Sequence, residues 1–181
     1  SLTKISPNGI DSYIIPILQA WASAGLRNHE ESIRHLNNQA DKGILSPIYD
    51  YHLALINDWH GEYTSAKQKY EDAIIKSNTP NAKLFISASS FFERRQLYEL
   101  RDSVNKKFER TMPDSSELLI FKTKNNKFNP NKPLVTNIRE GIAETFLNTS
   151  EILYNEGLVT QAIIYSQIAF FLNRNLDNAK L

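Results

Sequence analysis

The chain has 181 residues, 41% of them hydrophobic, and a formal net charge of +1, which is typical of one ordinary globular domain. It contains no cysteine, so disulfide frameworks, thiolate metal sites and cysteine nucleophiles are excluded. Six glycines and seven prolines are too few for a collagen-like or low-complexity chain. No apolar run reaches the roughly 18 residues of a membrane helix, so we expect no membrane span.

The ends and the composition give weak indications of origin. The chain begins with Ser1 rather than Met, and residues 175–181 have the pattern of the start of a further helix. We therefore expect an excerpt of a longer protein. Frequent asparagine indicates an AT-rich bacterial genome. The lack of cysteine is compatible with either of two soluble compartments, the cytoplasm or the periplasm, and leaves the localisation open.

A period of 34 residues runs through the first half of the chain. Ala20, Ala54 and Ala88 are 34 residues apart, each in a segment with helical apolar spacing. Thirty-four residues accommodate two helices of about four turns and two tight turns. Further columns at the same period are Ser32/Ala66/Leu100, Leu36/Tyr70/Val104 and Gln39/Ala73/Lys107. The period predicts stacked pairs of helices.

Glycine and proline mark the same divisions. The first four glycines step by 16, 18 and 18 residues, and we expect glycine to end each helix in the left-handed conformation. Ser46-Pro47 and Thr79-Pro80 have the pattern of an N-cap followed by proline at the first helical position. The predicted units are residues 13–46, 47–80, 81–111 and 138–176, with an insertion at 112–137.

The second unit carries a more specific pattern. It has a leucine–small pair in its first helix, a Gly-acid-Tyr turn, and an Ala-x3-aromatic-x2-Ala second helix, formed by Leu53-Ala54, Gly61-Glu62-Tyr63, Ala66, Tyr70 and Ala73. This unit resembles a tetratricopeptide repeat. The last unit resembles one too, and its segment 141–165 is similar to uncharacterised bacterial tetratricopeptide proteins. The first and third units depart from the family pattern at Pro16, Arg95 and Lys107.

The resemblance implies a fold for the whole chain. It implies an all-α, right-handed superhelical solenoid of antiparallel helix pairs, with about four repeats and one insertion in a single domain. A single unit cannot bury its apolar face, so stability would come from stacking neighbours. A generic helical domain with accidental spacing is the alternative.

The resemblance also implies a partner-binding surface. In tetratricopeptide arrays the first helices of successive units line a concave groove, and here the corresponding residues are Ile17, Trp21, Tyr51, Leu55, Trp59, Phe85, Ser89 and Phe92. Family members that grip a C-terminal carboxylate carry Lys and Asn on these columns, and this chain does not. We therefore expect a hydrophobic peptide or protein partner. The alternatives are that residues 2–10 cover the aromatic side chains, or that a second copy covers them in a homodimer.

Residues 94–132 form a basic segment. They carry a net charge of +5, and the residues that could contact an anion are Arg94, Arg95, Lys122, Lys124 and Lys127. No aromatic platform for stacking bases accompanies them, so nucleic-acid binding is the less favoured interpretation and a solvated loop the more favoured one. The run 118–121 is apolar and is expected to pack against the array as a short helix or extended piece.

No pattern for chemistry emerges from the sequence. His29-Glu30-Glu31-Ser32-Ile33 starts like a zinc-binding His-Glu-x-x-His motif, but Ile33 replaces the second histidine. His52 and His60 are about 12 Å apart by helix rise, too far to chelate one metal ion. We find no glycine-rich phosphate loop and no serine elbow. We therefore expect a non-catalytic protein–protein interaction scaffold without metal or cofactor.

Overall fold

The structure is a computed structural model that describes residues 9–40, 43, 45–77, 81–122, 132–174 and 176. Its elements are all α-helices, which confirms the all-helical prediction for these ranges. In chain order they are α1 (Ile10–Gly25), α2 (His29–Ala40), α3 (Ser46–His60), α4 (Tyr63–Lys76), α5 (Ala82–Arg94), α6 (Tyr98–Thr111), α7 (Ser116–Lys122), α8 (Ile138–Asn155) and α9 (Val159–Leu172).

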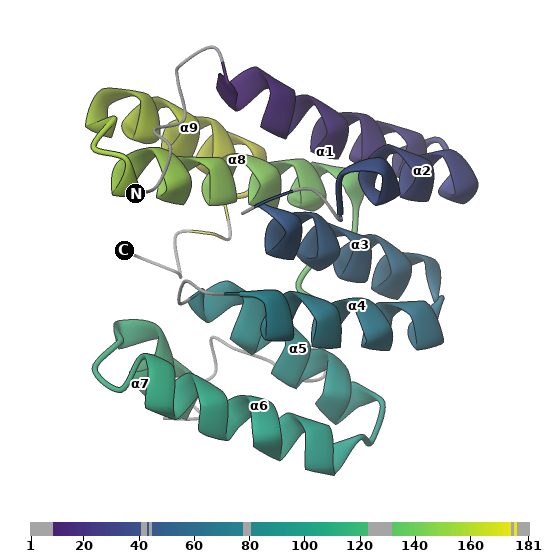
Figure 1. The fold of residues 1–181 in the computed structure, drawn as a ribbon, viewed down its shortest axis with the longest axis vertical. Coiled ribbons are helices and arrows are strands. Elements are labelled where there is room, and N and C mark those ends of the chain that lie inside the picture. The colour runs from purple at the N-terminus through teal and green to yellow at the C-terminus, as the bar shows by residue number, and fades with distance from the viewer. Residues whose placement is uncertain are drawn as a thin grey trace.

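Consecutive helices pack as adjacent pairs, α1 with α2, α3 with α4, α5 with α6, and α8 with α9 (Figure 1). Each pair is joined by a tight turn containing one residue with positive φ. These residues are Arg27, Gly61, Gln96 and Gly157. The first two separations, 34 and 35 residues, follow the period seen in the sequence, whereas the third, 61 residues, spans the predicted insertion. The observed arrangement is thus one of packed helix pairs, and a right-handed superhelix stays a prediction.

Two glycines, Gly25 and Gly141, allow α1 and α8 to approach closely. Gly61 and Gly157 have a left-handed backbone. Gly25 is the last residue of α1 as expected, but its φ is not positive, so the expected left-handed conformation is wrong there, and Gly141 lies inside α8. A Cβ added at Gly141 would overlap the ring of Trp21, and one at Gly25 would overlap the Ile138 side chain. These two contacts place α8 antiparallel to α1, at a distance that only glycine permits.

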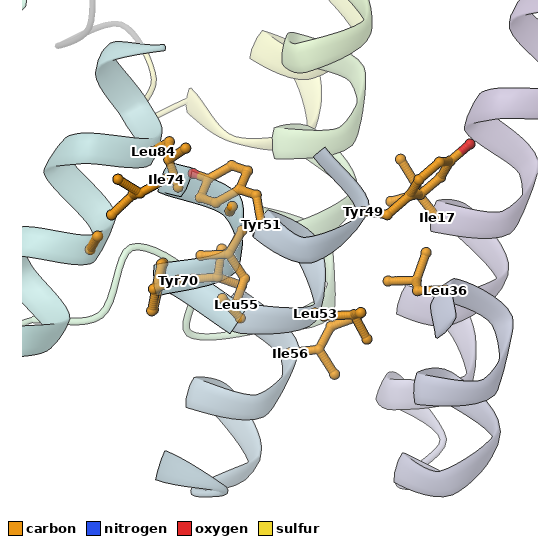
Figure 2. Packing of buried hydrophobic residues seen from close by; sticks show 14 of the residues in the cluster. Ile17, Leu36, Tyr49, Tyr51, Leu53, Leu55, Ile56, Tyr70, Ile74 and Leu84 are labelled. Carbon is orange, nitrogen blue, oxygen red and sulfur yellow. The ribbon is translucent and has the colours of Figure 1, made fainter. Parts of the chain in front are cut away.

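Helix α3 lies at the centre of the core. Every residue from 49 to 58 is buried, as expected for a helix that is covered on all sides. Tyr49 and Leu53 point toward Ile17 and Leu36 of the first pair, whereas Tyr51 and Leu55 point toward the side of α4 and α5 (Figure 2). Helices α1, α2, α4 and α8 therefore surround α3.

The predicted insertion contains a short helix. Helix α7 buries Leu118, and the half-buried Phe121 ring lies 6.1 Å from the ring of Phe108 in α6. The expectation that the apolar run 118–121 packs as a short helix is confirmed for Leu118 and Phe121, but Leu119 is 59% exposed. The Ile120 side chain lies outside the described residues. None of the helices in the described ranges is long and apolar enough to cross a membrane.

Candidate functional site

The residues expected to line an open groove are in the core. Seven of the eight are buried, and only Trp59 is partly exposed. The buried ones are Ile17, Trp21, Tyr51, Leu55, Phe85, Ser89 and Phe92. The expectation of an exposed aromatic face is therefore wrong. Helix α8 packs against α1 and α3 and covers part of this inner face (Figure 1). Of residues 2–10, the segment suggested as a cover, 2–8 lie outside the described residues, and Ile10 is buried in the core.

Trp21 is the first anchor between the inner face and α8. Its ring is fully buried and lies against Gly141. Its Nε1 donates a hydrogen bond to Nδ1 of His52 at 3.1 Å, and its ring centroid is 6.0 Å from that of Trp59. The close contact needs a glycine on α8, so the depth at which α8 sits depends on this pair.

His52 is held between Trp21 and α8. Because Nδ1 accepts from Trp21, a neutral imidazole carries its proton on Nε2, which lies 3.3 Å from the Asn148 side-chain amide. Because Nε2–H is then the donor, the Asn148 amide is oriented with its Oδ1 toward Nε2, where it accepts the hydrogen bond. Burial lowers the pKa of His52 to about 3, so the ring is neutral at pH 7.

A charged cluster lies between Gly141 and Asn148 on α8. Glu144 is buried, accepts a hydrogen bond from the Tyr51 hydroxyl at 3.0 Å, and pairs with Lys83 Nζ at 3.3 Å. The Tyr51 hydroxyl is also 3.1 Å from Ser87 Oγ. Side chains from α3, α5 and α8 thus meet at one carboxylate, which is satisfied by a cation and a hydroxyl.

Glu151 lies on the same face of α8, two turns beyond Glu144. Burial raises its pKa to about 7, with Lys83 lowering it and the charges of Glu144 and Glu117 raising it. Burial also raises the pKa of Tyr13, for which Glu151 is a charged neighbour. This carboxylate therefore titrates near neutral pH on the helix that covers the inner face.

The predicted basic patch does not form among its described members. Arg94 makes a bidentate pair with Asp58 at 3.2 and 2.7 Å and is nearly buried, so its expected role in a free patch is wrong. The Arg95 guanidinium lies 4.0 Å from the centre of the Tyr63 ring. Lys122 pairs with Glu109 at 3.0 Å. Lys124 and Lys127 lie outside the described residues.

Sequence reasoning missed one histidine pair. The rings of His29 and His60 lie 4.8 Å apart, and His29 Nε2 is 3.0 Å from Asn57 Oδ1. Burial and the neighbouring His29 lower the pKa of His60. The two histidines are 31 residues apart, the same separation as Trp21 and His52. Both pairs join the first helix pair to α3, and this repeated separation is the sequence signal that could have revealed the histidine pair. No group of three or more metal-ligating side chains occurs in the part of the chain that the structure describes.

Scans of family models, curated proteins and solved structures give no match to this chain. The tetratricopeptide resemblance therefore stays a prediction based on the residues quoted above. The geometry yields one candidate site, the inner face of α1, α3 and α5. In this structure α8 of the same chain contacts that face at Trp21, His52, Tyr51 and Lys83.

Proposed function

We propose that the chain is a non-catalytic protein–protein interaction scaffold that recognises a helical segment on the inner face of α1, α3 and α5. One observation carries the proposal: that face already holds a helix, α8. The contact combines a large aromatic anchor, Trp21, with two polar clusters. Aromatic anchors in desolvated pockets are typical of helix-in-groove recognition.

The two polar clusters would fix the position of a bound helix along the inner face. His52 selects an amide at position 148, and Lys83 together with Tyr51 selects a carboxylate at position 144. The two positions are four residues apart on one face of a helix. A partner helix with a small residue, an acid and an amide at the spacing of Gly141, Glu144 and Asn148 would satisfy the same groups. We infer that such partners compete with α8 for this face.

The perturbed titratable groups support a binding role over a catalytic one. Burial between Trp21 and Asn148 explains the lowered pKa of His52, and burial also explains the raised pKa of Glu151. The Glu144 carboxylate is occupied by Lys83 and Tyr51. Buried structural groups have perturbed pKa values without doing chemistry. The resemblance to bacterial tetratricopeptide proteins, whose arrays bind proteins, points in the same direction.

The test uses the full chain with α8 displaced. Gly141→Leu places a side chain where the Trp21 ring lies, so α8 cannot dock. A fluorescent peptide with the sequence of residues 138–155 is titrated with this variant, and anisotropy is measured. We expect saturable binding to Gly141→Leu and none to the wild type, whose face is occupied. Asn155→Leu, an exposed position on the same helix, is the matched control and is expected to behave like the wild type.

A second peptide tests the register. In the peptide, Glu144→Lys places a cation opposite Lys83, so binding to the Gly141→Leu chain is expected to fall at least tenfold. If the Gly141→Leu chain keeps its helical circular dichroism but binds neither peptide, the inner face is only a core, and the proposal is wrong.

A further inference from the structure

Four residues of α8 lie on the side of the helix that meets the inner face. They stand at positions 141, 144, 148 and 151, and their steps of 3, 4 and 3 keep them on one side. The first three are matched by groups of α1, α3 and α5, through the contacts described above. The fourth, Glu151, is half-buried and forms no hydrogen bond or ion pair with any described residue. The contact is therefore unmatched at one of its four positions.

Tyr13 is the unmatched group on the opposite side of this contact. It lies on α1 two turns before Trp21, and α8 runs antiparallel to α1, so Tyr13 comes to the Glu151 end of α8. Its ring is 2% exposed, and its hydroxyl is buried without a hydrogen-bond partner among the described residues. The Thr149 hydroxyl beside it already donates to the Thr145 carbonyl at 2.7 Å. A buried hydroxyl without a partner weakens the contact that covers it.

The balance of charge explains why Glu151 has no partner. Among the charged groups that act on Glu151, Lys83 is the one cation. Its Nζ already pairs with Glu144 at 3.3 Å, and a third carboxylate, that of Glu117 in α7, also acts on Glu151. Burial, together with these two acids, raises the pKa of Glu151 to about 7, although Lys83 lowers it. Docking of α8 thus covers a carboxylate that the inner face cannot pair.

We propose that the partner of the inner face carries an uncharged amide at the position that Glu151 occupies in α8, and that it displaces α8 because α8 is mismatched there. A glutamine has the length of Glu151, carries no charge and can accept a hydrogen bond from the Tyr13 hydroxyl. A partner with this residue keeps the three matched positions of α8 and satisfies the fourth. Helix α8 is then an occupant that a better-matched helix exchanges. This inference rests on the proposed recognition of a helix by the inner face.

The first test compares two peptides on the Gly141→Leu chain, whose α8 is displaced. Both cover residues 138–155, one with the natural sequence and one with Glu151→Gln, and anisotropy is measured at pH 8, where the carboxylate is charged. We expect the Glu151→Gln peptide to bind roughly tenfold more tightly. A Glu140→Gln peptide is the matched control. It loses the same charge at a residue that accepts from Thr136 rather than from the inner face, so its affinity is expected to stay within about twofold of the natural peptide.

Two outcomes of this comparison contradict the proposal. Equal affinities of the Glu151→Gln and natural peptides overturn it and leave the proposed function intact, because both peptides still bind. If no peptide binds, the proposed function is wrong, and this proposal is overturned with it.

Tyr13→Phe in the same Gly141→Leu chain tests how the amide is recognised. The substitution keeps the buried ring and removes the hydroxyl. We expect the Glu151→Gln peptide to lose several-fold in affinity, because its hydrogen-bond donor is gone, and the natural peptide to change little. An equal change for both peptides means that Tyr13 does not recognise the amide, and it overturns the assignment of that residue to the partner.

A further measurement uses the full chain with α8 docked. Glu151→Gln in the full chain removes the mismatch in α8 itself, so hydrogen exchange of the α8 amides at pH 8 is expected to slow several-fold relative to the wild type. Unchanged exchange shows that Glu151 does not weaken the docking of α8, and it overturns the proposal without any use of the displaced variant.

Discussion

Two polar clusters connect α8 to the inner face, and they are built in opposite ways. In the cluster around His52, the partners are the neutral groups of Trp21 and Asn148. The other cluster, around Glu144, contains the cation of Lys83 and lies near a second carboxylate, Glu151. Both are buried contacts between α8 and helices far away in the sequence. They differ in which protonation state favours the folded chain.

Acid weakens the neutral cluster. The pKa of His52 is about 3 in the folded chain, against an ordinary value of 6.5 in the unfolded chain. Between these values the unfolded state binds the extra proton, so stability rises with pH up to 6.5 and is lost as the pH falls. At about 1.4 kcal/mol per pKa unit, the loss between pH 6.5 and 5 is roughly 2 kcal/mol.

Base weakens the charged cluster. The pKa of Glu151 is about 7 in the folded chain and 4.5 without the fold. Between pH 4.5 and 7 the folded state binds the extra proton, so this group stabilises the fold at low pH and loses its contribution as the pH rises. The two clusters therefore oppose each other between pH 4.5 and 6.5. Their combined pH dependence is flatter than that of either one.

The largest expected effect comes from removing the anchor that both clusters need. Trp21→Ala empties a fully buried site against Gly141 and leaves His52 without its donor. We expect a loss of roughly 3–5 kcal/mol in the free energy of unfolding, measured by urea denaturation. Leu26→Ala, at a side chain that is 83% exposed, is the control, with a change within about 0.5 kcal/mol. A similar loss in both variants would contradict the role of Trp21.

The next effect isolates the charged cluster. Tyr51→Phe keeps the buried ring but removes the hydroxyl that donates to Glu144 at 3.0 Å. A hydrogen bond to a charged group contributes about 1.5–3 kcal/mol, so we expect a loss of that size at pH 7. Tyr63→Phe, in an exposed ring at the start of α4, is the matched control, with an expected loss below about 0.5 kcal/mol. An unchanged Tyr51→Phe would show that Lys83 alone satisfies Glu144.

The helix pairs could be predicted from the sequence because their signal is local and repeated. Ala20, Ala54 and Ala88 recur at the 34-residue period, and all three are buried. The position of α8 could not be predicted, because it rests on contacts between single residues that are 61 to 120 positions apart. The one available signal was Gly141 inside a helical pattern, where glycine costs about 1 kcal/mol relative to alanine and therefore indicates close packing.

The same limit explains why the groove residues were placed wrongly. Aromatic columns such as Tyr51 and Phe85 have identical patterns whether they face solvent or another helix. The pairing of Lys83 with Glu144 joins residues 61 positions apart and has no spacing rule. The resemblance to a repeat family predicts that neighbouring helix pairs stack. It does not predict that a later helix, α8, packs against the inner face.

Replacing His52 should leave Glu151 as the group that sets the pH dependence of stability. His52→Gln keeps an amide that can accept from Trp21 and has no proton to gain above pH 3. We expect the stability difference between wild type and variant to grow by roughly 2 kcal/mol from pH 5 to 6.5. The measurement is urea denaturation at several pH values in one buffer series. A difference that is constant with pH would mean that His52 is not neutral in the folded chain.

Glu151→Gln is expected to give the smallest change in stability at a single pH. It is nevertheless the most informative variant about the opposing pH dependences of the two clusters. Glu151→Gln removes the group that favours acid, so we expect the variant to gain stability relative to wild type as the pH rises from 4.5 to 7. Its own stability should then fall steeply below pH 6.5, because the His52 effect is no longer offset. The double variant His52→Gln/Glu151→Gln lacks both groups and is the control. If it keeps the slope of Glu151→Gln, the acid sensitivity belongs to a group other than His52.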